Sequence, residues 1–299
     1  MHRILLIFLL QVLIKNVYAL YENTDTWKTA YAQYCNGNQQ SPIEITTDNA
    51  KFSTTLKKPV WTGTIPQANA QFTVKNDGKS IYVDAKMSGT KLTTTAGEFI
   101  LDGYHLHWSN VDSGKGSEHV VNGIQYPLEV HFVHYNTKYG SVGGALANPD
   151  GLTVIGVLFK EEKTETSLFE KILPSDLTSL QTVNGQTLMP AVNIAVEVQK
   201  YITFDEIVNY KGSLTTPNCN EVVDWWFKSK PIYVKSEQLS ALRKVAFAEN
   251  DKFNYRALQP LNNRAVTRNF EGTVSKGQTK FASSILSSMV VIGLAKFII

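Results

Sequence analysis

Between residues 70 and 160, apolar and polar residues alternate in short runs that are separated by turn-forming residues. Successive side chains of an extended strand point to opposite faces, so this alternation predicts β-strands with one face buried. Asn76-Asp77-Gly78, which joins the first two runs, is a strong signal for a β-hairpin. We therefore predict strands at Gln71–Lys75, Ser80–Ala85, Lys91–Thr95, Tyr104–Trp108, Leu128–Tyr135 and Leu152–Phe159.

Helical periodicity is scarce along the chain. The best case is Ser236–Ala248, where Ser236 can cap the N-terminus and Leu239 and Leu242 recur at helical spacing. A shorter helix is expected at Thr166–Leu173. Because no repeat, low-complexity tract or linker interrupts the pattern, it predicts one mainly β domain with a few surface helices on a mostly antiparallel sheet.

The N-terminal end of the chain differs from this domain. Residues 1–19 begin with the basic His2 and Arg3, continue through a short apolar stretch and end on the small residue Ala19. This arrangement is typical of a signal peptide, which implies secretion and removal of the segment. A buried first helix is the alternative. The apolar stretch is too short for a membrane-spanning helix.

The C-terminal residues 276–299 end in an apolar run that follows a small, polar stretch. Small residues, a polar spacer and an apolar tail form the signal for a glycosylphosphatidylinositol (GPI) anchor, whose attachment removes the tail. The lipid would be attached at Gly272, Ser275 or a neighbour. A retained membrane helix and a plain terminal helix are the alternatives. The expected mature domain is residues 20–275.

The cysteine content bears on the cellular compartment of the protein, and the net charge bears on its binding partners. In a secreted chain the two cysteines, Cys35 and Cys219, suggest a disulfide, and two buried free thiols are the alternative. No Asn-x-Ser/Thr sequence occurs, so N-glycosylation is not expected. A net charge of +3 is too small to indicate a nucleic-acid partner.

Histidines are concentrated in one part of the chain. Of the six, all except His2 lie between His105 and His134. His105 and His107 are two residues apart, so on a strand both imidazoles leave the same face. If the strand that carries His131 lies beside theirs, the three rings converge. The alternative is that alternating histidines only form the polar face of two strands.

Three neutral imidazoles without a further protein ligand are typical of a catalytic zinc site with one open position. Zinc lowers the pKa of a bound water to about 7 and so generates a nucleophile at neutral pH. Histidine ligands usually donate their other N–H to a nearby acceptor. Glu129 shares a strand face with His131 and is the candidate acceptor.

Over residues 27–270 the sequence resembles the α-carbonic anhydrases. The resemblance implies a fold with a central twisted ten-stranded sheet and one Zn²⁺ at the base of a cone-shaped cleft. It rests on several motifs that match together and in the family's order: Gln40–Ile45, Tyr104–Trp108, Gly116–His119, Glu129–Asn136, Asp150–Gly156, Tyr210–Pro217 and Asn254–Arg256.

Carried over by position, the resemblance implies that His105, His107 and His131 bind the zinc. Thr215 would accept a hydrogen bond from the metal-bound hydroxide and donate its own to Glu118, with Thr216 beside it. It also implies a supporting role near the ligands for Asn254, and a disulfide between Cys35 and Cys219. The apolar wall that holds carbon dioxide would comprise Val133, Val154, Leu214, Val223 and Trp225.

The sequence departs from the family pattern at three places. Lys79 stands where fast members of the family have a histidine that shuttles protons, and an unperturbed lysine, with a pKa near 10.4, is a poor relay at pH 7. Gly103 replaces a glutamine that usually hydrogen-bonds the first zinc histidine, a loss that lowers affinity or activity. The family's active-site tyrosine before Trp27 is not recognisable, and Tyr21 is the residue nearest to its place.

Together these observations predict a zinc enzyme that converts carbon dioxide reversibly to bicarbonate and a proton at the outer cell surface. We expect a monomer held to the membrane by its lipid anchor. A surface binding or adhesion protein with weak or no catalysis is the competing class, although this chain keeps all three zinc histidines. A zinc esterase would use the same site.

Overall fold

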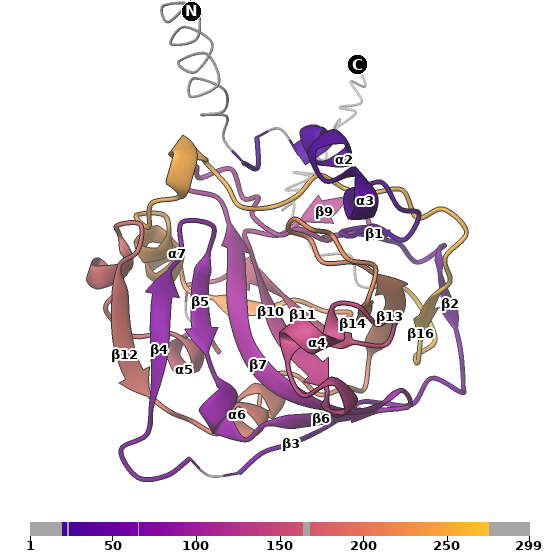
Figure 1. Cartoon of the computed structure of the whole chain (residues 1–299), viewed down its shortest axis with the longest axis horizontal. Coiled ribbons are helices and arrows are strands. Elements are labelled where there is room, and N and C mark those ends of the chain that lie inside the picture. The colour runs from indigo at the N-terminus through magenta and orange to yellow at the C-terminus, as the bar shows by residue number, and fades with distance from the viewer. Residues whose placement is uncertain (1–19, 23, 65, 164–167, 275–299) are drawn as a thin grey trace, which may run out of the picture.

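A large mixed sheet of thirteen strands dominates the computed structural model, which describes residues 20–22, 24–64, 66–163 and 168–274. Residues 1–19 and 276–299, with the predicted leader and tail, lie outside the described residues. Figure 1 shows the strands side by side across the molecule. Ten of them form one continuous path, in the order β12 (Gln186–Pro190), β4 (Gln71–Asn76), β5 (Ile81–Asp84), β7 (Gly97–Trp108), β10 (Leu128–Asn136), β11 (Leu152–Glu161), β14 (Val223–Lys228), β13 (Ile207–Gly212), β16 (Val266–Arg268) and β2 (Ala50–Phe52).

Three further strands join this sheet off the main path: β3 (Val60–Thr62) pairs with β6 (Lys91–Thr94), β6 also pairs with β7, and β15 (Ile232–Val234) pairs with β11. Most pairs are antiparallel, and β11 with β14, β11 with β15 and β16 with β2 are parallel. A separate small sheet contains β1 (Glu44–Ile45), β8 (Val120–Val121) and β9 (Ile124–Gln125). The predicted fold class is confirmed, and the sheet has thirteen strands where ten were predicted, of which ten form the continuous path.

The central strands bury both faces of the sheet. On β10, Val130 and Phe132 pack into the larger core, whereas Val133 faces the smaller one together with Val154 and Trp225. The period-two pattern predicted this division, because alternate residues of a strand face opposite sides. Each predicted strand lies on an observed one, and the Asn76-Asp77-Gly78 turn joins β4 to β5 in a hairpin.

Strand β7 contains a β-bulge that reverses which residues face the larger core. On β10, Val133 is paired with Gly103 but His134 is paired with Leu101, so Asp102 is the extra residue. Leu101 and Tyr104 both pack into the larger core, although they are three residues apart. Asp102 and Gly103 therefore both face the opposite side, which is the side that carries His105.

The described helices are short and lie outside the sheet: α2 (Trp27–Ala30), α3 (Ala32–Cys35), α4 (Val142–Ala145), α5 (Phe169–Ile172), α6 (Ile194–Gln199) and α7 (Ser236–Leu242). The α7 helix is shorter than predicted, because Ala246 donates its N–H to the carbonyl of Gln181 instead of continuing the helix. Ser236 is its first residue and Lys235 its N-cap. None of the described helices combines the length and the apolar character that crossing a bilayer requires.

Single-turn 3-10 helices complete the secondary structure: η1 (Thr24–Thr26), η2 (Lys86–Ser88), η3 (Thr137–Tyr139), η4 (Thr178–Leu180) and η5 (Ala248–Asn250).

The N-terminal segment is fastened at two points. Cys35, at the end of α3, forms a disulfide with Cys219 across a sequence separation of 184 residues, as predicted. The backbone N–H groups of Leu20 and Tyr21 donate to the two carboxylate oxygens of Asp251 at 3.1 and 3.0 Å. These bonds place Tyr21 against Trp27, with a ring-centroid separation of 5.7 Å.

Candidate metal centre

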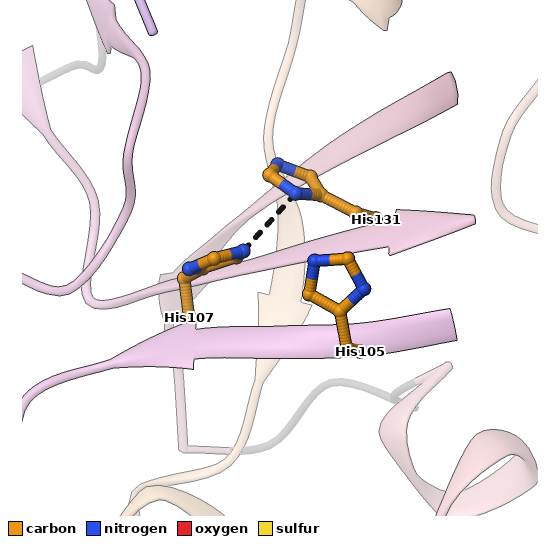
Figure 2. Close-up of side chains that lie close together, drawn as sticks. All are labelled: His105, His107 and His131. Carbon is orange, nitrogen blue, oxygen red and sulfur yellow. Dashed lines mark hydrogen bonds between the residues drawn. The ribbon is translucent and has the colours of Figure 1, made fainter. Parts of the chain in front are cut away.

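Three histidine side chains meet on the face of the sheet opposite the larger core (Figure 2). His105 on β7 is directly opposite His131 on β10, and His107 lies two residues further along β7. One potential ligand nitrogen from each ring lies within 4.8 Å of the others. The two-residue spacing and the antiparallel register together produce this convergence, as the sequence predicted.

The hydrogen bonds around two of these rings determine which nitrogen is free. His107 donates from Nδ1 to the main-chain carbonyl of Asn254 at 2.7 Å, so its Nε2 carries a lone pair. His131 donates from Nε2 to Oε1 of Glu129 at 2.6 Å, which leaves a lone pair on Nδ1. These two acceptor nitrogens face each other at 3.1 Å. Because two lone pairs at that distance repel, a shared cation fits the geometry.

Burial keeps the imidazoles of His105 and His107 neutral, which is the form that binds a metal. Desolvation, and after it the charge of His131, lower the pKa of His105 to about 3. Burial likewise holds the pKa of His107 well below its ordinary value. The donor set therefore fits a zinc ion that needs three neutral nitrogens and an open fourth position.

Glu129 is a fully buried carboxylate that organises one side of the centre. Its Oε1 accepts hydrogen bonds from Nδ1 of His119 at 2.8 Å and from His131, and its Oε2 accepts the backbone N–H groups of Glu118 and His119, both at 2.8 Å. Burial raises the pKa of Glu129, but the two imidazoles outweigh it and hold the pKa well below its ordinary value. Glu129 is thus an ionised acceptor.

His119, Glu129 and His131 form a second cluster of potential metal ligands. Both ring nitrogens of His119 already have partners, because Nε2 is bonded to the hydroxyl of Tyr210 at 2.7 Å and Nδ1 to Glu129. This cluster is therefore a hydrogen-bond network behind the ligands. The sequence assigned no role to His119 and Tyr210, although both lie within recognised motifs.

Glu118 lies beside the centre with one oxygen anchored. Its Oε1 accepts the backbone N–H of Arg256 at 2.9 Å and lies 3.5 Å from Nδ1 of His107. Burial and the charge of Glu129 raise the pKa of Glu118, and the nearby Thr215 side chain opposes this rise. The Thr215 contact falls short of a well-formed hydrogen bond, since Oε2 of Glu118 is buried without a partner among the described residues.

A small cavity of about 30 Å³ opens beside the histidines, and such a volume admits a molecule of only a few atoms. Its lining includes two of the three histidines, both threonines and four of the five predicted wall residues: His105, His131, Val133, Val154, Leu214, Thr215, Thr216 and Trp225. Val223 does not line it. It precedes Trp225 by two residues on β14, a distance of roughly 6.6 Å along a strand, and packs into the smaller core.

The remaining predicted residues occupy the surroundings of the centre. Asn254 is fully buried and its side chain donates to the main-chain carbonyls of Leu106 at 2.7 Å and Lys79 at 2.8 Å. The side chain of Lys79 is exposed. Tyr21, whose place the sequence left open, is buried, and the negative charge of Glu118 is among the causes that raise its pKa, after burial.

Converging imidazoles on two neighbouring strands, with an ionised carboxylate behind one of them, define a candidate metal centre in a protein of mainly β structure. The comparison with known families is more specific: a model of the eukaryotic-type carbonic anhydrases matches residues 22–270. The chain belongs to this family, as its resemblance implied.

Curated relatives agree with this assignment. Mouse carbonic anhydrase 6 is 32% identical over 257 residues, which cover 82% of this chain and 77% of that protein. Horse and pig carbonic anhydrase 3 are each 34% identical, over 269 and 274 residues respectively, and the match covers 85% of this chain and 98% of each relative.

Proposed function

We propose that this chain binds one Zn²⁺ through His105, His107 and His131 and catalyses the reversible hydration of carbon dioxide. The observation that carries the proposal is the pair of acceptor nitrogens, Nε2 of His107 and Nδ1 of His131, that face each other at 3.1 Å. Each lacks a proton because the single proton of its ring lies on the other nitrogen, which donates it in a hydrogen bond to a fixed acceptor. Family membership supports the same reaction.

Bound zinc would supply the positive charge that lowers the pKa of a water molecule to about 7. The chain's own residues perform the remaining tasks. Thr215 lies at the cavity beside the histidines and would orient the reacting water through its hydroxyl, with Glu118 as the nearby acceptor for the hydrogen bond of that hydroxyl. The fixed geometry matters because a displacement of about 1 Å can reduce a rate by about 100-fold.

The apolar wall suits a small, uncharged substrate. Val133, Val154, Leu214 and Trp225 line the cavity, so a linear molecule such as carbon dioxide loses no hydrogen bonds on entering it. The cavity of about 30 Å³ matches a three-atom molecule beside the histidines, whereas an ester with a sizeable leaving group would have to extend out of it. This volume is the observation that favours carbon dioxide over ester hydrolysis.

Export of the product proton is the step at which we expect the enzyme to be slow. Lys79 occupies the place of the family's proton shuttle, and its side chain is exposed. A lysine transfers protons poorly at neutral pH. Turnover is therefore expected to rise when imidazole buffer is added, because the buffer carries the proton instead.

The experiment is stopped-flow hydration of carbon dioxide by the purified chain, after removal of metal and after addition of zinc. We expect activity only with zinc. Thr215→Val should lower kcat about 100-fold and leave zinc affinity unchanged, whereas Thr93→Val, on the exposed face of β6, serves as the matched control. A folded, zinc-loaded protein without hydration activity would favour a surface binding protein instead.

We also propose that the chain acts outside the cell, where the Cys35–Cys219 disulfide is stable, and that residues 276–299 direct attachment of a GPI anchor. The full chain, expressed in animal cells, should appear at the surface and be released by a phospholipase specific for phosphatidylinositol. Surface protein that resists the phospholipase would contradict the lipid anchor. The expected domain remains residues 20–275, and a monomer is expected by size-exclusion chromatography.

A further inference from the structure

The backbone of Gly103 lies two residues from His105 on the same side of β7, and the space above it is filled by another residue. A Cβ at Gly103 would lie 2.5 Å from the hydroxyl oxygen of Tyr82 and 2.4 Å from the carbonyl oxygen of Val83. Neither distance leaves room for a side chain. Tyr82, on β5, therefore takes the place of a side chain at position 103.

Tyr82 is also the direct cross-strand neighbour of His105. The two residues are paired in the antiparallel ladder between β5 and β7. Directly opposed residues have Cβ atoms about 4.5–5.5 Å apart and share a face of the sheet. The half-buried ring of Tyr82 thus runs from beside His105 to a position over Gly103, on the side where the three histidines meet.

A carboxylate holds the tyrosine in this position. The hydroxyl of Tyr82 donates to Oδ2 of Asp102 at 2.8 Å, and Nζ of Lys86 lies 3.3 Å from Oδ1 of the same carboxylate. Asp102 faces this side only because it is the extra residue of the β-bulge. Burial and the carboxylate raise the pKa of Tyr82 well above its ordinary value, so the phenol remains a donor.

His105 depends on packing more than the other two histidines do. His107 and His131 are each fixed by a hydrogen bond from the ring nitrogen that faces away from the centre. Within the part of the chain that the structure describes, neither ring nitrogen of His105 has a hydrogen-bond partner. The orientation of His105 is consequently determined by the side chains that surround it.

We propose that Tyr82, held by Asp102, is a positioning residue that orients His105 for metal binding. The proposal rests on the proposed zinc site and extends it to two residues with no assigned role. It also accounts for Gly103: the tyrosine and the carbonyl of Val83 occupy the space of the missing side chain. The cross-strand pairing of Tyr82 with His105 would then take the place of the hydrogen bond that His105 lacks.

The test measures the zinc dissociation constant of the purified chain by competition with a chromophoric chelator, together with unfolding of the metal-free protein. Tyr82→Ala should raise the dissociation constant about tenfold, as expected when the support of a ligand is lost. Tyr82→Phe and Asp102→Ala should each raise it about threefold, because each removes only the bond that holds the ring. The double variant should resemble either single one.

Tyr139→Phe is the matched control. Its hydroxyl also donates to an aspartate, Oδ1 of Asp150 at 2.5 Å, but it belongs to η3 at the far end of β10. We expect this variant to keep the wild-type dissociation constant. A purely structural role for Tyr82 would lower the stability of the metal-free protein without changing the zinc affinity of the folded molecules.

Wild-type zinc affinity in Tyr82→Ala, or additive effects of Tyr82→Phe and Asp102→Ala, would overturn the proposal. If Tyr82→Ala does not fold, the other two variants and their combination decide. The outcome is separable from that of the proposed function: a wild-type chain that binds zinc but does not hydrate carbon dioxide refutes the reaction only. A wild-type chain that does not bind zinc refutes both.

Discussion

Replacing Glu129 by glutamine changes the centre at its most connected residue. The carboxylate is fully buried and accepts four hydrogen bonds, two on each oxygen. Glutamine has nearly the same shape but offers one oxygen and one NH₂ group. Whichever way the amide is turned, its NH₂ group faces two donors. At least two of the four hydrogen bonds are therefore lost.

The expected loss of stability follows from this count. A hydrogen bond to a charged group contributes about 1.5–3 kcal/mol, so losing two removes about 3–6 kcal/mol. This range agrees with the 3–5 kcal/mol typical of breaking a buried charged pair. Because a domain is stable by only about 5–15 kcal/mol in total, we expect Glu129→Gln to fold marginally.

Zinc affinity should fall as well, for a reason that concerns the tautomer of His131. In the wild type, Glu129 requires a proton on Nε2 of His131 and thereby frees Nδ1. If the amide NH₂ of the variant faces this ring, it favours the other tautomer, in which the proton sits on Nδ1 and blocks the metal. Loss of such a partner reduces metal affinity by about 10–100-fold.

Urea unfolding of the metal-free protein measures the first effect, and competition with a chelator measures the second. Glu98→Gln is the control, because Glu98 is exposed and its ion pair with Lys91, at 2.9 Å, contributes at most about 1 kcal/mol. A Glu129→Gln protein within 1 kcal/mol of the wild type, and with equal zinc affinity, would refute the reasoning.

Three further predictions concern other parts of the molecule. Gly103→Ala should lower the free energy of unfolding by about 1–3 kcal/mol in thermal melts, because the added Cβ would lie 2.4 Å from a main-chain oxygen. Gly143→Ala is the control and should leave the free energy of unfolding unchanged, because the nearest atom to its Cβ would be 3.9 Å away. Reducing the bond between Cys35 and Cys219 should lower stability by at most about 5 kcal/mol in urea titrations under reducing conditions, and an unchanged midpoint would contradict the prediction. Lys79→His should raise carbon dioxide turnover in weak buffer and have little effect at high imidazole concentration. Equal gains in both conditions would rule out proton export as the slow step.

Much of the fold could be predicted from the sequence because its signals are local. Alternation located β4, β5 and β10 to within a residue or two, and an Asn-Asp-Gly turn specified the first hairpin. The end of α7 could not be predicted in this way. The chain leaves the helix because Ala246 bonds to Gln181, which is distant in sequence.

The part of the metal centre that could be predicted is the part set by the short spacing of residues along a strand. His105 and His107 alternate on one strand, and register with His131 needed only the assumption that the two strands are neighbours. The surroundings of Glu118 depend instead on Arg256, which comes from a distant loop. The support of His105 by Tyr82 depends on the bulge. In the sequence, the bulge is marked only by the three-residue spacing of the apolar residues Leu101 and Tyr104, where two residues would be expected.

The bulge at Asp102 divides β7 into two parts that alternate in opposite register. Before it, odd-numbered residues such as Phe99 enter the larger core, and after it even-numbered residues such as Leu106 do so. Deleting Asp102 would restore one continuous alternation along β7. Either the core residues before the bulge or the histidines after it would then have to move to the other face of the sheet. A sequence of this kind can acquire or lose such a metal site by insertion or deletion of a single codon, without any substitution among the ligands.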